Sequence, residues 1–132
     1  MMRLSIIGVP SSAGSYAAGQ DQAPAALRNA GLVQALSDAG LLVRDHGDLP
    51  EQVWRPDRQR PFAQNAGQVT AGLQELADRL GPPLADGDTV LVLGGTCTIA
   101  LAVINLSLAV CPGGQRSPLP TVLAGSRAVL CR

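Results

Sequence analysis

The sequence predicts an α/β protein in which a parallel β-sheet is covered by helices on both faces. Three short apolar segments, at residues 3–9, 41–43 and 89–93, are bounded by Gly, Pro or polar residues, as strands usually are. A loop and a helical pattern of apolar residues follow each of them. Continuous apolar strands that alternate with helices are typical of parallel sheets with right-handed crossovers.

The first unit consists of a strand at residues 3–9, a loop rich in Ser, Gly and Ala, and a helix. The helix is expected to begin at Asp21 or Gln22, because Pro24 fits the first turn, where its missing N–H costs little. Gly31 should break or kink this helix, and Gly40 is a suitable residue just beyond its end.

The second unit begins with a strand that starts at residues 41–43 and ends near residues 47–48. An irregular connection at residues 49–60 leads to a helix at residues 63–80, which the Gly81-Pro82-Pro83 segment should end. Its apolar stripe consists of Val69, Leu73, Leu76 and Leu80. The third unit has a strand at residues 89–93 and a helix at about 96–106 that has almost no polar face.

The last segment, residues 111–132, differs in composition from the rest. It is rich in Pro, Gly and Arg, and no acidic residue occurs after Asp88. A weak strand near Val122 and Leu123 is one interpretation, but we expect a disordered tail that leaves the outer edge of the third strand open. Residues 1–110 are therefore predicted to form the folded α/β part.

Composition excludes several classes of protein. Ten basic and ten acidic residues give a net charge of zero, which offers no attraction to nucleic acid or to a membrane surface. The amino terminus does not resemble a signal peptide, and no apolar run is long enough to span a bilayer. Cys97, Cys111 and Cys131 form no CxxC pair, which argues against disulfides and structural zinc. We expect a cytoplasmic protein that is aggregating, oligomeric or partly molten.

Three segments, in order along the chain, resemble the arginase, or ureohydrolase, family. They are Ile7-Gly8-Val9-Pro10 with the following Ala23-Pro24 and Ala30-Gly31-Leu32, then Gly47-Asp48-Leu49-Pro50, then Val90-Leu91-Val92-Leu93-Gly94-Gly95. The resemblance implies a three-layer α/β/α fold. It also implies two manganese ions that activate a water for attack on the carbon of a small guanidino or amidino substrate.

The sequence departs from this family where the metal ligands should lie. The family's motif after the third strand is Gly-Gly-Asp-His-Ser, and this chain has Gly94-Gly95-Thr96-Cys97-Thr98. Cys97 thus stands at the position of the family's first metal-ligand His, and it is our only candidate metal ligand. The family's later Asp-Ala-His-x-Asp and Asp-x-Asp motifs are absent. We expect a truncated, arginase-like member with no catalytic residues of its own and no tightly bound manganese.

Cys97 also admits interpretations outside the family. At a helix amino terminus the thiol pKa falls, so a thiol-dependent enzyme or a soft metal ligand is one interpretation. We favour a small buried residue in an apolar helix, because no second ligand or base can be identified. A further alternative is a non-catalytic binding module that uses an exposed sheet edge.

Four other features are interpreted as structural. His46, the single histidine, is expected to face solvent or to cap, and Trp54 to cover the edge of the core. The Gly94-Gly95-Thr96 segment has the pattern of a backbone anion site, but it is also common in α/β folds. The glycine-containing loop before Asp21 is expected to connect elements rather than to bind phosphate.

Overall fold

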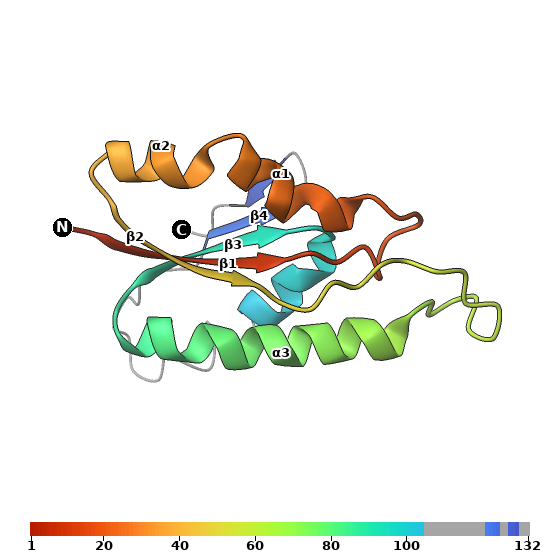
Figure 1. Cartoon of the computed structure of the whole chain (residues 1–132). Coiled ribbons are helices and arrows are strands. Elements are labelled where there is room, and N and C mark those ends of the chain that lie inside the picture. The colour runs from red at the N-terminus through yellow and green to blue at the C-terminus, as the bar shows by residue number, and fades with distance from the viewer. Residues whose placement is uncertain (105–120, 125–126, 130–132) are drawn as a thin grey trace.

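The computed structural model of the protein describes residues 1–104, 121–124 and 127–129. Figure 1 shows one β-sheet with a layer of helices on each face. Helices α1 (Ala23–Asn29) and α2 (Leu32–Asp38) cover one face, and α3 (Ala66–Ala85) covers the other. The predicted α/β/α class is therefore confirmed. Among the described residues, no helix is long and apolar enough to cross a membrane.

The sheet has the strand order β2-β1-β3-β4-β5. The predicted strands are β1 (Arg3–Val9), β2 (Leu42–Asp48) and β3 (Thr89–Gly94), and β1 pairs in parallel with both others. Beyond β3 lie β4 (Thr121–Ala124), which is parallel, and β5 (Arg127–Val129), which is antiparallel. The sheet thus has two strands more than the sequence predicted.

The helices follow the predicted order, and α3 differs from its predicted bounds. Gly31 has a φ of 88° and separates α1 from α2, which accounts for the break expected there. Helix α3 begins at Ala66 and continues through Pro82 and Pro83 to Ala85, although we expected it to end at Leu80. Pro83 and Leu84 are buried, so packing of this last turn offsets the backbone hydrogen bonds that the two prolines cannot donate.

Two apolar cores lie on opposite faces of the sheet. The larger core joins β1 and β3 to α3 and to the segment after β3, with Ile7, Leu76, Leu80, Val90 and Val92 at most 1% exposed. The smaller core joins Leu4, Ile6, Leu91 and Leu93 to α1 and α2. Both faces of β1 and β3 are therefore buried, as their continuous apolar sequences predict.

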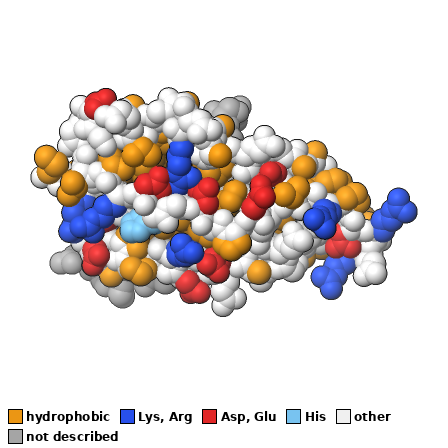
Figure 2. Space-filling view, in the orientation of Figure 1, with side chains coloured by type: hydrophobic (Ala, Val, Ile, Leu, Met, Phe, Trp, Pro, Cys, Tyr) orange, Lys and Arg blue, Asp and Glu red, His pale blue; other side chains and the backbone are white. Residues whose placement is uncertain are grey.

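Strand β2 forms one edge of the sheet, and its second half is polar. Arg44, Asp45, His46 and Asp48 are all exposed, as is much of the strand. Figure 2 shows basic, acidic and histidine side chains gathered along this side of the molecule. Charged side chains on an edge strand oppose pairing with another sheet, so this edge is protected against aggregation.

The segment after β3 packs through one side only. A short 3-10 turn, η2 (Cys97–Ile99), continues into a helix whose described part is residues 100–104. Ile99, Ala102 and Val103 are buried, whereas Leu101 and Ile104 are 56% and 47% exposed. The apolar helix thus leaves large side chains in solvent, and self-association of the chain stays a prediction.

The predicted disordered tail falls mostly outside the described residues. Residues 111–120, 125–126 and 130–132 are not described, so their disorder stays a prediction. The backbone of 121–124 pairs with β3 from Leu91↔Thr121 to Gly94↔Ala124. The outer edge of β3, which we expected to stay open, is therefore covered at the weak strand that the sequence admits near Val122.

Candidate functional site

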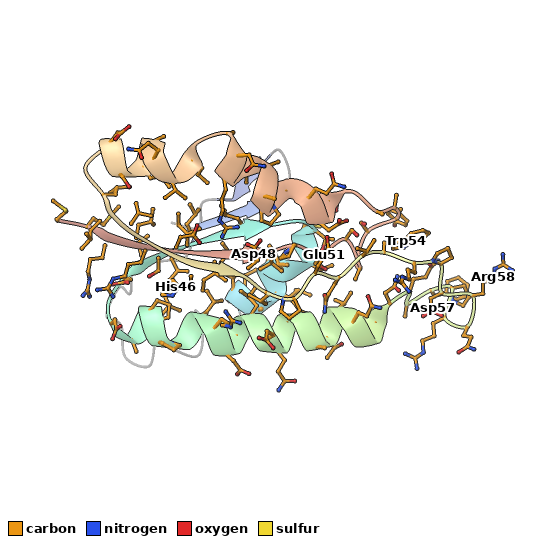
Figure 3. All side chains as sticks on the ribbon, viewed as in Figure 1. His46, Asp48, Glu51, Trp54, Asp57 and Arg58 are labelled. Carbon is orange, nitrogen blue, oxygen red and sulfur yellow. The ribbon has the colours of Figure 1, made fainter. Side chains whose placement is uncertain are left out.

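The candidate site lies where β1 and β3 end. These strands are neighbours and parallel, but the chain leaves them in opposite directions. After β1 it passes through α1, on one face of the sheet, to β2; after β3 it passes along the other face to β4. Open α/β sheets bind ligands at the carboxyl ends of strands that diverge in this way. Figures 1 and 3 show the loops after β1, β2 and β3 gathered at this end of the sheet.

Backbone hydrogen bonds tie these three loops together. The Thr96 N–H donates to the Ser11 carbonyl at 3.1 Å, and the Gly95 N–H donates to the Val9 carbonyl at 3.2 Å. From the other side, the Ser12 N–H donates to the Gln52 carbonyl at 2.8 Å. A Cβ at Gly95 would overlap with the Ser11 carbonyl oxygen. The loop after β3 can therefore approach the loop after β1 this closely only if residue 95 is glycine.

Gln52 links these loops to helix α3, and the sequence did not indicate this role. Its Oε1 accepts a hydrogen bond from Ser11 Oγ at 3.2 Å, and its Nε2 donates to the Gln68 carbonyl at 2.8 Å. Gly72 leaves room for this side chain, because a Cβ there would lie 2.7 Å from Gln52 Oε1. A glutamine in an irregular loop carries no local pattern, so only the folded structure identifies its role.

Cys97 is the first residue of η2 and is exposed, so our favoured interpretation of it as a buried residue is wrong. The 3-10 turn directs Ile99 into the larger core and leaves Cys97 on the solvent side. Thr96 is buried, and its hydroxyl is hydrogen-bonded to that of Thr98. Thr98 in turn lies against Gly14, where a Cβ would come within 2.9 Å of it.

His46 lies far from Cys97 in the fold and belongs to a structural network. Its Nε2 is 3.0 Å from Ser5 Oγ, which donates to Asp88 Oδ2 at 2.8 Å. Arg3 Nε lies 2.8 Å from Asp88 Oδ1. Asp88 directly precedes β3, whereas Cys97 follows it. The network that contains His46 and the loop that contains Cys97 therefore lie at opposite ends of that strand.

These positions do not fit the pair of manganese ions that the resemblance implies. Manganese takes carboxylate, imidazole and water ligands, and two ions need several carboxylates between them. Within the described residues, no three His, Cys, Asp or Glu side chains come together in a group that could hold a metal. The assignment of Cys97 as a metal ligand stays a prediction, and the residues placed around it offer hydroxyls that bond each other.

An ion-pair cluster beside the site fixes α1 to the edge strand. Arg28 makes a bidentate pair with Asp45, with Nε–Oδ2 and Nη2–Oδ1 distances of 2.7 and 2.8 Å, and it also pairs with Asp48. The hydrogen bonds from Arg28 hold the pKa of Asp45 below its ordinary value, although partial burial opposes them. A Cβ at Gly8 would overlap with the Asp48 carboxylate as it is placed, so the absence of a side chain at Gly8 leaves room for this cluster.

The Arg28 cluster predicts a specific dependence of stability on pH. Because folding lowers the pKa of Asp45, its ionised carboxylate stabilises the folded state at neutral pH. This stabilisation is lost as the pH falls from about 4 through the lowered pKa of Asp45. We expect Arg28→Met to lower the free energy of unfolding by about 1–2 kcal/mol at pH 7, and by less at acidic pH. Urea denaturation across this pH range measures both effects.

Arg79→Met is the matched control, because Arg79 pairs with Glu75 at 3.6 Å on the exposed surface of α3. Its effect should stay below about 0.5 kcal/mol. Equal losses for the two variants, or a loss at Arg28 that does not depend on pH, would show that the ion pairs of the cluster do not stabilise the fold.

Comparisons with known proteins match this chain over most of its length. The model of the arginase family matches residues 2–115. Mitochondrial arginase-2 of Homo sapiens is 34% identical over 110 residues, which cover 83% of this chain and 31% of that protein. The arginase of Bacillus subtilis strain 168 is 34% identical over 104 residues, which cover 76% of this chain and 34% of that protein.

Solved structures give the same picture. The crystal structure of arginase from Bacillus cereus superimposes with a TM-score of 0.66 at 31% identity, covering 77% of this chain and 33% of that one. Arginase from Bacillus caldovelox gives 0.64 at 30% identity, covering 80% and 36%. The chain therefore spans about a third of the length of the relatives that it matches.

Proposed function

Because the chain belongs to the arginase family, we propose that its 132 residues form an amino-terminal ureohydrolase unit that does not hydrolyse guanidino compounds by itself. The family's substrates would be small guanidino or amidino compounds. One observation supports the proposal: the loop that follows β3 presents Thr96, Cys97 and Thr98, and among the described residues no three His, Cys, Asp or Glu side chains form a group that could hold a metal.

The chemistry of the reaction explains why these donors matter. A guanidinium carbon is a poor electrophile, and a bound manganese pair would supply a hydroxide strong enough to attack it. The Thr96 hydroxyl is buried and bonded to Thr98, so it does not replace a carboxylate that orients or binds a metal. We therefore expect no tightly bound manganese in the 132-residue chain.

Activity assays test this proposal directly. Purified chain is incubated with arginine, agmatine or formiminoglutamate, with and without manganese, and release of urea or amide is measured. We expect no manganese-dependent release, and no rise of the melting temperature with manganese, because stabilisation requires affinity for the folded state. The arginase of Bacillus subtilis serves as the positive control for the assay.

Two results would contradict the proposal. The first is manganese-dependent product release above the metal-free control. The second is a manganese-dependent rise in melting temperature that disappears in the Cys97→Ala/His46→Ala double variant, since that variant removes the thiol of η2 and the single histidine. Either would show that the chain assembles a metal site from the residues that it has.

A thiol-dependent activity is the second candidate, and the exposure of Cys97 is what favours it. Alkylation by iodoacetamide across pH, in a Cys111→Ser/Cys131→Ser background, separates the two functions. For an inactive unit we expect Cys97 to be alkylated no faster than the thiol of glutathione at any pH of the series. A rate that is already maximal below neutral pH would favour the thiol-dependent enzyme.

The remaining alternative is an interaction module that uses a sheet edge. The charged side chains along the free edge of β2 make this less favourable, because they oppose the addition of a strand. We include a cytoplasmic location, and the absence of nucleic-acid and membrane partners, in the proposal on the basis of composition alone.

A further inference from the structure

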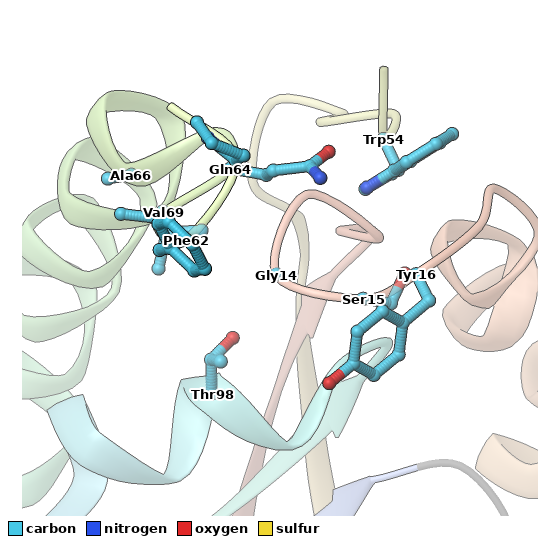
Figure 4. A pocket seen from close by; sticks show the side chains of 11 residues that line it. Gly14, Ser15, Tyr16, Trp54, Phe62, Gln64, Ala66, Val69 and Thr98 are labelled. Atoms are coloured by element: carbon cyan, nitrogen blue, oxygen red, sulfur yellow. The ribbon is translucent and has the colours of Figure 1, made fainter. Parts of the chain in front are cut away.

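All the aromatic side chains of this protein line one cavity. The chain contains one Trp, one Tyr and one Phe. Trp54, Tyr16 and Phe62 together line a cavity of about 330 Å³ (Figure 4). They come from two loops, Tyr16 from the loop after β1 and the others from the segment between β2 and α3. A core that needed aromatic packing would have used these rings inside, but none of the three is buried.

The fold leaves two of these rings in solvent. The side chains of Tyr16 and Phe62 are 99% and 102% exposed, so neither gains burial from the fold. Exposed large apolar groups that gather around one hollow mark binding sites more often than isolated ones do. Trp54, which we expected to cover the edge of the core, is partly buried and also lines this cavity.

The walls of the cavity are held in place by elements of the fold. Val69 and Ala66 belong to the first turns of α3, and Thr98 belongs to η2 after β3. The Trp54 backbone N–H donates to Ser12 Oγ at 2.8 Å, which attaches this part of the segment to the loop after β1. The cavity thus lies at the diverging carboxyl ends of β1 and β3, and its volume is within the range of ligand pockets.

Two side-chain N–H donors face the cavity, and the residues that line it also carry the hydroxyl groups of Ser15, Tyr16 and Thr98. Figure 4 shows the Trp54 indole nitrogen and the Gln64 amide turned toward the same space. Gln64 Oε1 accepts from the Asp57 N–H at 3.3 Å, which leaves its Nε2 to donate. No charged side chain is among the described residues that line the cavity. A cation would find no carboxylate here, whereas a neutral acceptor would meet two N–H groups.

We propose that this cavity binds an uncharged, planar heteroaromatic ring. The ring stacks against the aromatic side chains, and its ring nitrogen or carbonyl oxygen accepts hydrogen bonds from Trp54 and Gln64. The proposal requires neither a metal nor Cys97, which does not line the cavity. Its success or failure is therefore independent of the proposed loss of hydrolase activity.

Ligand-observed saturation-transfer NMR on the full 132-residue chain tests the proposal. The probes are nicotinamide, uracil and adenine, which are planar and uncharged. Cyclohexanecarboxamide is the saturated counterpart of nicotinamide, and 1-methylnicotinamide is its cationic counterpart. We expect at least one neutral ring to bind, with both counterparts of nicotinamide weaker than nicotinamide itself. Failure of all three neutral rings, or tighter binding of either counterpart, would overturn the proposal.

Variants assign the binding to this cavity. Tyr16→Ala/Phe62→Ala removes two exposed rings, so it should leave the circular-dichroism spectrum and the melt unchanged and weaken binding by on the order of tenfold per ring. Trp54→Phe keeps a ring but removes the N–H, and should weaken binding further than the Leu42→Ala control, which alters an exposed apolar residue on β2. Unchanged affinity in the double variant would overturn the assignment.

Discussion

Replacing Gly95 by alanine is expected to cost about 3 kcal/mol or more of unfolding free energy. The added Cβ would overlap with the Ser11 carbonyl oxygen and would lie 2.8 Å from that of Gln20. Both obstacles are backbone atoms in loops that are hydrogen-bonded to their neighbours, so neither can move aside as a side chain can. The hydrogen bonds from Gly95 to Val9 and from Thr96 to Ser11 should therefore be lost together.

Chemical denaturation of Gly95→Ala and Gly67→Ala, side by side, measures this effect. Gly67 lies in the first turn of α3, and a Cβ added there would have no neighbour within 4 Å, so alanine should stabilise the protein by up to about 1 kcal/mol. Loss at Gly95 without loss at Gly67 would support the close approach of the three loops. A Gly95→Ala variant within about 0.5 kcal/mol of the parent would contradict it.

The parts of the fold that were predictable are those with a strong local pattern. The continuous apolar runs of β1 and β3 indicated buried parallel strands, and Leu73, Leu76 and Leu80 marked the face of α3 that packs on the sheet. Strand β2 was predicted to end near residues 47–48 and does end at Asp48, although its second half is polar and lies at an edge. Helix α3 extended past the predicted stop, because burial of Pro83 and Leu84 outweighed a local rule.

Pairing between distant segments was not predictable in the same way. The backbone of β4 pairs with β3 within a segment whose Pro and Gly content favours disorder. Nothing local in residues 121–124 specifies a parallel partner as distant in sequence as Leu91. The partner and register of a strand depend on which sheet edge the rest of the fold leaves free. No short segment of the sequence specifies that edge by itself.

The candidate site was predictable in its position but not in its contents. The strand followed by Gly94 and Gly95 indicated a functional edge and drew attention to Cys97, whose exposure we misjudged. Gln52 and the aromatic cavity were missed because their partners come from separate loops. Tyr16 and Phe62 lie far apart along the chain, and only folding brings them to one hollow.

Replacing Leu80 by alanine is expected to lower the free energy of unfolding by about 2–5 kcal/mol. Leu80 is fully buried in the larger core, where α3 packs against β1 and β3. The substitution removes apolar burial and leaves a cavity that close-packed neighbours fill only in part. Since whole domains are stable by roughly 5–15 kcal/mol, this single change should remove a large share of the total.

The size of this loss also decides whether the chain has a fixed core. Leu42→Ala is the matched control, because Leu42 is 46% exposed on the edge strand and its loss should stay below about 1 kcal/mol. From zero net charge and an apolar final helix, the sequence led us to expect an aggregating or partly molten chain. In a molten chain neither leucine has fixed neighbours, so the two substitutions would lower the free energy of unfolding by similar amounts. A loss at Leu80 several times that at Leu42, with a single cooperative transition, would show that α3 is packed on the sheet as described.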